Sequence, residues 1–272
     1  MLLLLVVLLF VIYLLLLRTR SIYKKKFFEF AQFNYAHRGL FDKTAGVAEN
    51  SLTAFKRAAK CGYGAELDVR LSRDGKLMVM HDENIKRTCG VSRIVEEYTA
   101  NELRKYKLLG TNEQIPFLEE VLEIFDGCSP LMIELKTRND NYKQLCEAVF
   151  MVLDEYNGSY CIQSFDPRVL KWLKKNRPHI LRGQLSGLSY NRSGISKLAE
   201  KIAVNFLIVN AVGMPDFVSY RFEKRGNISL KLCRRLYGTP VLYWTIRQDR
   251  DFEIAKQDFA GVIFETESFI GK

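Results

Sequence analysis

Residues 64–69 read GAELDV and residues 131–136 read LMIELK, and these two stretches decide the fold class. Each is an apolar, strand-like run that acids interrupt: Glu66 and Asp68 in the first, Glu134 in the second. Because side chains two positions apart in a strand share a face, Glu66 and Asp68 lie on one face and their apolar neighbours on the other. Such a strand lies either at a solvated surface or inside a barrel whose acids bind a cation.

Similar apolar runs recur along the chain with helical stretches between them. The expected strands cover residues 33–37, 64–69, 131–136, 160–164, 180–184, 206–210, 240–244 and 261–264. The expected helices cover residues 51–60, 117–125, 142–156, 167–176, 195–203, 229–237 and 249–256. Alternation of strands and helices is typical of a parallel α/β sheet with crossover helices. Eight such strands favour a closed (β/α)₈ TIM barrel, and a doubly wound open sheet is the alternative.

A further strand-like run, residues 77–81, does not fit this alternation. Only about six residues separate it from the second strand, whereas a parallel crossover needs a dozen or more. We therefore expect it to return antiparallel as a hairpin, with Asp74 and Gly75 at the turn. Residues 71–115 then form a small insertion after the second barrel strand, which brings His81 back over the carboxyl ends of the strands.

The chain opens with an unbroken apolar run, LLLLVVLLFVIYLLLL, at positions 2–17. A signal peptide has a charged segment before the apolar run and a small-residue cleavage site after it, and neither is present here. We expect residues 1–17 to form one transmembrane anchor, although a bilayer usually requires about 20 residues. Five positive charges follow within residues 18–30, which predicts a basic juxtamembrane segment. The same charges place the rest of this single-pass membrane protein in the cytoplasm.

The remaining residues, 31–272, contain no linker rich in Pro, Gly or Ser, which favours one domain. The formal net charge is +10, and its clustering beside the anchor argues against a nucleic-acid partner. The six cysteines are scattered without a C-x-x-C pair, as is typical of reduced thiols in a cytosol-facing domain. The sequence does not indicate an oligomeric state.

Acids gather at the ends of the expected strands, where the active sites of parallel barrels lie. On the inner face of a barrel, Glu66, Asp68 and Glu134 would be buried close together and would repel one another. A bound cation removes that repulsion, and oxygen ligands of this kind suit one Mg²⁺ or Ca²⁺ ion. Lys136 shares the face of Glu134 and is expected to contact phosphate.

Two histidines are candidates for proton transfer. His37 ends the first strand and is followed by Arg38 and Gly39, and a guanidinium binds phosphate through two parallel hydrogen bonds. His81 ends the hairpin and is expected to face the metal opposite His37. Two imidazoles on either side of a bound phosphate can serve as general base and general acid near neutral pH.

Two further side chains are candidates for substrate binding. Glu49 precedes a helix for which Ser51 is the expected N-cap, and it is expected beside Arg38 or near the metal. Trp244 ends a later strand, where it either packs in the core or forms an apolar floor for a glycerol or lipid group.

Taken in order, these motifs resemble those of the glycerophosphodiester phosphodiesterase family. The motifs that carry the resemblance are His37-Arg38-Gly39, Glu49-Asn50-Ser51, Glu66-Leu67-Asp68-Val69, Asp74-Gly75, His81-Asp82, Glu134-Leu135-Lys136 and Trp244-Thr245. The resemblance covers residues 35–265, nearly all of the chain after the expected anchor. Ser51 stands where the family has threonine, and residues 261–265 lengthen the family's last motif, which leaves the role of Glu265 open.

The resemblance implies a (β/α)₈ barrel with a small insertion and a divalent metal on the three acids named above. It also implies acid–base catalysis by His37 and His81 and phosphate contacts from Arg38 and Lys136. The reaction would be hydrolysis of a glycerophosphodiester to sn-glycerol 3-phosphate and an alcohol, as part of glycerophospholipid metabolism. We expect His37 to act as base and His81 as acid, with water or a neighbouring glycerol hydroxyl as nucleophile. The partners would be this small substrate and the membrane.

Two other functions stay open from the sequence. A phosphodiesterase of the phospholipase C or D type, acting on intact phospholipid or sphingolipid, uses a similar barrel, and an apolar entrance to the barrel would favour it. A non-catalytic phosphate-binding barrel is the other alternative. Such a barrel is expected to have lost a metal ligand or a histidine, and none of the family positions is lost here.

Overall fold

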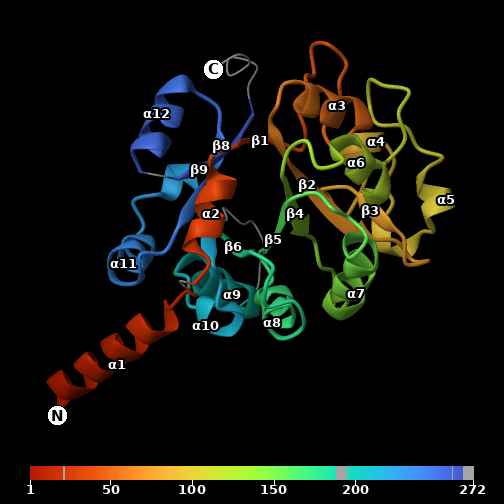
Figure 1. Ribbon diagram of the computed structural model, residues 1–272. Coiled ribbons are helices and arrows are strands. Elements are labelled where there is room, and N and C mark those ends of the chain that lie inside the picture. Colours follow the sequence, from red (N-terminus) through yellow and green to blue (C-terminus); the bar gives the residue numbers. More distant parts are fainter. Residues whose placement is uncertain (21, 188–194, 259, 266–272) are drawn as a thin grey trace.

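The computed structural model describes residues 1–20, 22–187, 195–258 and 260–265. Within them, eight parallel strands form a closed barrel surrounded by helices (Figure 1). The barrel strands in sheet order are β1 (Asn34–His37), β9 (Gly261–Phe264), β8 (Val241–Ile246), β7 (Phe217–Arg221), β6 (Arg182–Ser186), β5 (Tyr160–Ser164), β4 (Leu131–Leu135) and β2 (Gly64–Leu71). The barrel closes because β1 pairs with both β9 and β2. This closure confirms the (β/α)₈ barrel and excludes the doubly wound sheet.

Helices alternate with these strands as predicted. The longer ones are α3 (Leu52–Lys60), α6 (Leu118–Phe125), α7 (Tyr142–Leu153), α8 (Pro167–Asn176), α9 (Ile195–Asn205), α11 (Ile228–Tyr237) and α12 (Asp249–Gln257). In α6, Val121, Leu122 and Phe125 are buried because their spacing of one, three and four places them on one face. The Ser51 hydroxyl accepts a hydrogen bond from the Ala54 N–H at 3.1 Å, which confirms Ser51 as the N-cap of α3.

One predicted strand is wrong. Residues 206–209 form the turn between the end of α9 and the short helix α10 (Asn210–Gly213), and the barrel strand of this region is β7. The run reads FLIVN, and a short apolar run of this kind does not distinguish a strand from a buried helical connection. Leu207 and Val209 are buried in that connection, so their hydrophobicity reflects packing between helices.

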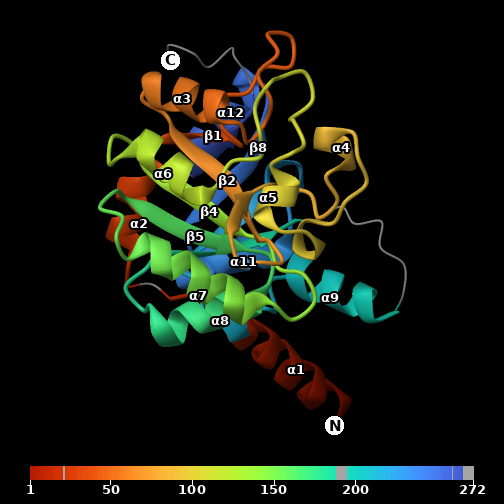
Figure 2. The ribbon, with the colours of Figure 1, turned by 90° about the vertical axis from the view of Figure 1, so that its right-hand side faces the viewer.

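The predicted insertion is present between β2 and β4. β3 (Leu77–Val79) pairs antiparallel with the end of β2, which confirms the hairpin. The insertion also contains α4 (Lys86–Cys89), a 3₁₀ turn (Val95–Glu97) and α5 (Ala100–Leu103). Its own small core includes Met78, Met80, Ile85, Val95 and Leu103. Figure 2 places α4 on the opposite side of the barrel from α2 (Lys24–Ala31), so the insertion lies at the carboxyl ends of the strands.

The amino-terminal end of the barrel is closed by α2. Phe27 of α2 packs against Phe217 at the start of β7, with ring centroids 5.1 Å apart. The Tyr35 hydroxyl, at the start of β1, donates a hydrogen bond to the Phe30 carbonyl at 2.9 Å. Phe27 and Phe30 thus belong to the barrel's core, although both fall in the range expected as a juxtamembrane segment.

The first helix, α1 (Leu2–Leu16), projects from the body (Figure 1). The expected transmembrane anchor over residues 1–17 is not found: within the described residues, no helix is both long and apolar enough to cross a membrane. Fifteen helical residues extend about 22 Å, against about 30 Å of bilayer hydrocarbon. The body-proximal end of α1 is fixed to the barrel. The Tyr237 hydroxyl donates to the Leu14 carbonyl at 2.6 Å, and the Tyr13 hydroxyl lies 2.7 Å from the Ser229 hydroxyl.

Candidate active site

The barrel interior changes from apolar to polar along the strands. Nearer the amino-terminal ends it is filled by Tyr35, Met132, Cys161, Phe217, Leu242 and Ile263, above the two phenylalanines of α2. Two residues further along the same strands the chain has His37, Glu134, Gln163, Ser219, Trp244 and Glu265. Because strand side chains alternate, these polar residues share the inward face of the apolar ones and form a polar layer at the carboxyl ends.

Three carboxylates lie at the centre of the polar layer. Glu66, Asp68 and Glu134 are buried, and one carboxylate oxygen from each lies within 4.8 Å of those from the other two. β2 and β4 pair in parallel with Asp68 opposite Glu134, so strand register makes these two side chains neighbours. Glu66 precedes Asp68 by two residues and shares its face.

Burial controls the protonation of these acids. Burial, followed by the charges of Asp68 and Glu134, raises the pKa of Glu66 well above its ordinary value. Burial raises the pKa of Glu134 to about 7 despite the nearby Lys136 ammonium. Burial alone would also raise the pKa of Asp68, but Lys136 and other nearby cationic side chains outweigh burial and hold that pKa well below its ordinary value. The site therefore holds more carboxylates than its own cations can keep ionised.

This donor set fits a divalent cation. The carboxylate oxygens of Glu66, Asp68 and Glu134 are hard ligands that converge on one point, and a dication would stabilise the ionised form of all three. Oxygen ligands accept both Mg²⁺ and Ca²⁺, so the chemistry of the donors does not select between the two ions.

Two side-chain cations flank the acids. The Lys136 ammonium lies 2.6 Å from Glu134 Oε1 and 3.1 Å from Asp68 Oδ1. Burial opposes its charge, but these two carboxylates raise the pKa of Lys136 above its ordinary value, so the ammonium stays protonated. Arg38 Nη1 donates to Glu49 Oε1 at 2.7 Å, and Arg38 Nε lies 3.5 Å from Asp68 Oδ2. Glu49 therefore lies beside Arg38, which is one of the two positions expected for it.

The backbone at Arg38 has an unusual conformation. Arg38 has a φ of 58°, a left-handed value that is uncommon for residues other than glycine. This conformation lets the Arg38 N–H donate to Glu66 Oε2 at 3.2 Å. Gly39 follows with a φ of 78°, and a Cβ there would lie 2.9 Å from backbone and side-chain atoms of Ala54. The turn after β1 thus needs glycine at position 39 to bring Arg38 over the acids.

His37 is paired with a carboxylate from the last strand. Its Nδ1 forms a hydrogen bond with Glu265 Oε1, and its Nε2 lies 3.8 Å from Glu66 Oε2. Arg247 Nε donates to the other oxygen of Glu265 at 2.8 Å. Burial lowers the pKa of His37, and the opposing effect of Glu265 does not restore its ordinary value. Glu265, whose role the sequence left open, is therefore the carboxylate partner of His37.

His81 has a similar arrangement in the insertion. Its Nδ1 lies 2.6 Å from Asp82 Oδ1, and Arg87 Nε donates to Asp82 Oδ2 at 2.6 Å. Arg70 holds the His81 backbone, because its Nε and Nη2 both donate to the His81 carbonyl, at 3.1 and 3.0 Å. Burial, followed by the positive charge of Lys136, lowers the pKa of His81 to about 4. Each histidine thus has a carboxylate at Nδ1, which leaves Nε2 for proton transfer.

A cleft of about 720 Å³ opens over this layer. Its lining includes the site residues His81, Glu134 and Lys136, together with Phe165, Glu200, Lys201 and Val204. Trp244 packs edge to face against Phe165, with ring centroids 5.9 Å apart, and its indole N–H donates to the Ser219 carbonyl at 3.1 Å. Trp244 thus supports the cleft wall through Phe165.

A family model described as the glycerophosphoryl diester phosphodiesterase family matches residues 37–264. The chain belongs to this family. It is 37% identical over 162 residues to a glycerophosphodiester phosphodiesterase of Caldanaerobacter subterraneus subsp. tengcongensis, which covers 55% of this chain and 65% of that protein. It is 30% identical over 152 residues to human lysophospholipase D GDPD1, covering 51% of this chain and 46% of that protein.

A solved structure is also similar. The glycerophosphodiester phosphodiesterase of Thermotoga maritima superposes with a TM-score of 0.63 and 26% identity, covering 85% of this chain and 93% of that one. The matches to the two sequence relatives span less than two thirds of either protein's length.

Most of the residues that the sequence predicts at the active site of this family member meet at one site in the structure. His37 and Arg38 lie around the acids with Lys136, His81 lines the same cleft, and Trp244 stands behind a cleft wall. Sequence reasoning missed the partners that orient the histidines. Asp82 had a signal, because it follows His81 directly. Glu265 had one too, because it lies two residues after an inward residue of the last strand.

Proposed function

We propose that this family member hydrolyses glycerophosphodiesters to sn-glycerol 3-phosphate and an alcohol. The observation that carries the proposal is the polar layer, in which a buried acidic triad, two cations and two histidine–carboxylate pairs share one barrel mouth. The name of the Caldanaerobacter relative supports the same activity. A divalent cation, Mg²⁺ or Ca²⁺, held by Glu66, Asp68 and Glu134, would supply neutralisation of the phosphodiester charge.

The two side-chain cations bind the phosphodiester. Arg38 and Lys136 are both protonated and lie beside the acids, so they can pair with the non-bridging oxygens of a phosphate placed there. The buried carboxylates orient both cations before substrate arrives. Glu49 further restrains the Arg38 guanidinium.

The histidines move the protons. One takes a proton from the nucleophile as its oxygen bonds to phosphorus, and the other donates a proton to the alkoxide as the second phosphorus–oxygen bond breaks. Both pKa values are lowered, so His37 and His81 are mostly neutral near pH 7. The acid must therefore gain its proton when the anionic substrate enters the cleft, since a nearby negative charge raises a histidine pKa. We assign His37 as base and His81 as acid, with water or the neighbouring glycerol hydroxyl as nucleophile. Attack by the hydroxyl gives a transient cyclic phosphate, which water then opens to sn-glycerol 3-phosphate.

The test is an assay of the full chain. We would incubate it with glycerophosphocholine or glycerophosphoethanolamine in Mg²⁺, Ca²⁺ or chelator, and measure sn-glycerol 3-phosphate. We expect turnover with metal, none with chelator, and none in Glu134→Gln. Chelator-resistant turnover, or full activity in Glu134→Gln, would overturn the proposal. Phosphate-ester binding without turnover would favour the non-catalytic barrel.

A lipid substrate is the second candidate. Leu198 and Ile202 lie four residues apart on α9 and are 55% and 44% exposed, while Val204 of the same helix lines the cleft. Exposed apolar side chains on a helix that lines the cleft suit an acyl chain, and the human relative is named a lysophospholipase D. Adding lysophosphatidylcholine to the same assay and measuring choline release distinguishes the candidates. Leu198→Glu would lower turnover of this lipid while leaving turnover of glycerophosphocholine unchanged.

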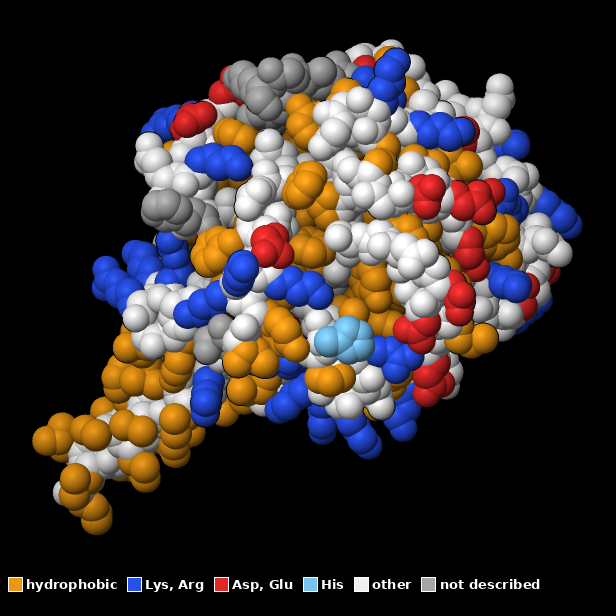
Figure 3. Space-filling model, viewed as in Figure 1, with side chains coloured by type: hydrophobic (Ala, Val, Ile, Leu, Met, Phe, Trp, Pro, Cys, Tyr) orange, Lys and Arg blue, Asp and Glu red, His pale blue; other side chains and the backbone are white. Residues whose placement is uncertain are grey.

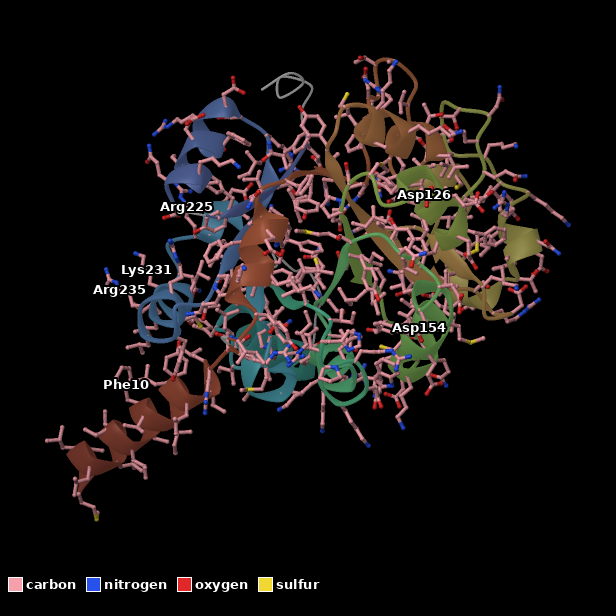
Figure 4. All side chains as sticks on the ribbon, in the orientation of Figure 1. Phe10, Asp126, Asp154, Arg225, Lys231 and Arg235 are labelled. Carbon is pink, nitrogen blue, oxygen red and sulfur yellow. The ribbon has the colours of Figure 1, made fainter. Side chains whose placement is uncertain are left out.

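We also propose that α1 binds a lipid surface on the cytoplasmic side. Figure 3 shows hydrophobic side chains covering α1, with Lys and Arg gathered beside its base. In Figure 4, Lys231 and Arg235 of α11 lie in that basic group, and Phe10 lies on the projecting helix. An exposed apolar helix beside positive charges favours an anionic leaflet.

In vesicle flotation, the double variant Lys231→Glu/Arg235→Glu should weaken binding to phosphatidylserine vesicles. Phe10→Glu should weaken binding to all vesicles. Unchanged flotation would contradict this.

A further inference from the structure

An arginine of the insertion joins two parts of the site that come from distant segments. Arg87 lies on α4, and its Nη1 and Nη2 donate to the two oxygens of Glu49, at 2.8 and 2.7 Å. Its Nε donates to Asp82 Oδ2 at 2.6 Å. Arg87 therefore binds two carboxylates at once, one from the barrel and one from the insertion.

Each of these carboxylates has a second partner in the site. Glu49 also accepts a hydrogen bond from Arg38 at 2.7 Å, and Asp82 holds the Nδ1 of His81 at 2.6 Å. The contacts form a continuous chain from Arg38 through Glu49, Arg87 and Asp82 to His81. The Glu49 and Asp82 side chains are 12% and 24% exposed, whereas Arg87 is 48% exposed, so the link crosses the rim of the site.

We propose that Arg87 is a positioning residue that couples the phosphate-binding Arg38 to the proton-transferring His81. The proposal rests on the proposed function for the roles of these two residues. A guanidinium has a planar set of donors that can bind two carboxylates in fixed directions, which the compact ammonium of lysine cannot reproduce. Without Arg87, Asp82 loses the partner that holds its second oxygen. Glu49 loses one of its two arginine partners and keeps the other, Arg38. Both the ring of His81 and the guanidinium of Arg38 then gain freedom.

Kinetics of Arg87→Met test this coupling in the full chain, with glycerophosphocholine and Mg²⁺. We expect kcat to fall about 10–100-fold, as for other residues that orient a catalytic group, and KM to rise. Arg87→Lys should recover part of the loss, because one carboxylate keeps a cation. The matched control is Arg73→Met, which removes an exposed arginine of the same insertion that pairs with Glu102 at 3.1 Å. It should leave kcat and KM unchanged, since exposed ion pairs contribute little.

Further variants separate the two arms. Asp82→Asn should mainly lower kcat, Glu49→Gln should mainly raise KM, and Arg87→Met should do both. Combining Asp82→Asn with Arg87→Met should lower kcat no further than the stronger single variant, because both break one path. Additive losses would overturn the proposal. The proposal would also be overturned if the kcat of each variant fell only in proportion to the fall in its thermal unfolding midpoint. Such a correlation would indicate a purely structural role.

A readout that needs no turnover keeps the proposal separate from the proposed function. The chain has three histidines, so ¹⁵N-histidine spectra are readily assigned. In wild type the His81 Nδ1 proton should be hydrogen-bonded and slow to exchange. It should be lost in Arg87→Met and kept in Arg73→Met, with His37 unchanged in both. An unchanged His81 signal in Arg87→Met would overturn the coupling even if the protein showed no phosphodiesterase activity.

Discussion

The two histidine–carboxylate pairs are chemically alike and are built in different ways. His37 and Glu265 are 228 positions apart, and they meet because β1 and β9 are neighbours in the closed barrel. His81 and Asp82 are adjacent in the chain and lie on the insertion, where Arg70 holds the His81 carbonyl. The His37 side chain is 13% exposed and that of His81 is 32% exposed.

The difference shows two ways of orienting a histidine ring at the mouth of the barrel. Strand register and burial hold His37, so its position depends on the closure of the whole barrel. Hydrogen bonds and ion pairs hold His81. Arg70 of the barrel donates to its carbonyl, and the ion pairs of Asp82 and Arg87 extend from the insertion to Glu49. We therefore expect His37 to tolerate loss of its carboxylate better than His81 does.

Removing either ring should have the largest effect on turnover. His37→Ala and His81→Ala should each lower kcat about 10²–10⁴-fold, because each ring carries one proton transfer in the proposed reaction. Steady-state kinetics on glycerophosphocholine measure the effect. His179→Ala, which removes the exposed third histidine, is the matched control and should keep wild-type kcat. If one of the two variants kept full activity, the pairs would not be functionally equivalent and the comparison would fail.

Removing the carboxylates should have a smaller and unequal effect. Asp82→Asn should lower kcat about 10–100-fold, as is usual for a partner that orients a catalytic histidine. Glu265→Gln should lower kcat less, because burial between strands still restrains the His37 ring. The ratio of the two kcat losses measures how far each ring depends on its carboxylate. A greater loss in Glu265→Gln would reverse the comparison.

The pH dependence of stability should show the smallest effect. The pKa of His81 is about 4 in the folded chain and about 6.5 when unfolded, so the unfolded state binds more protons between these pH values. The stability from neutral His81 is present above pH 6.5 and is lost as pH falls toward 4. Urea unfolding in chelator should show a smaller stability loss from pH 7 to pH 5 in His81→Gln than in wild type. An unchanged loss in His81→Gln would contradict the lowered pKa.

The sequence by itself determined the acidic centre and the hairpin. Glu66 and Asp68 share a face because the strand period is two, and residues 77–81 return antiparallel because the connection is too short for a crossover. Both conclusions rest on local geometry, which a short stretch of chain specifies without knowledge of its neighbours. The barrel followed from alternation, although β7 was placed too early because an apolar run does not distinguish a buried helical connection from a strand.

Only the tertiary structure decided which residues orient the catalytic candidates. Glu265 reaches His37 because the barrel closes between β9 and β1, and no local pattern connects residues at the two ends of the chain. Arg87 reaches both Glu49 and Asp82 because the insertion folds back over the strand ends. These contacts depend on how segments dock in space, and docking is a property of the packed fold that strand and helix periods do not encode.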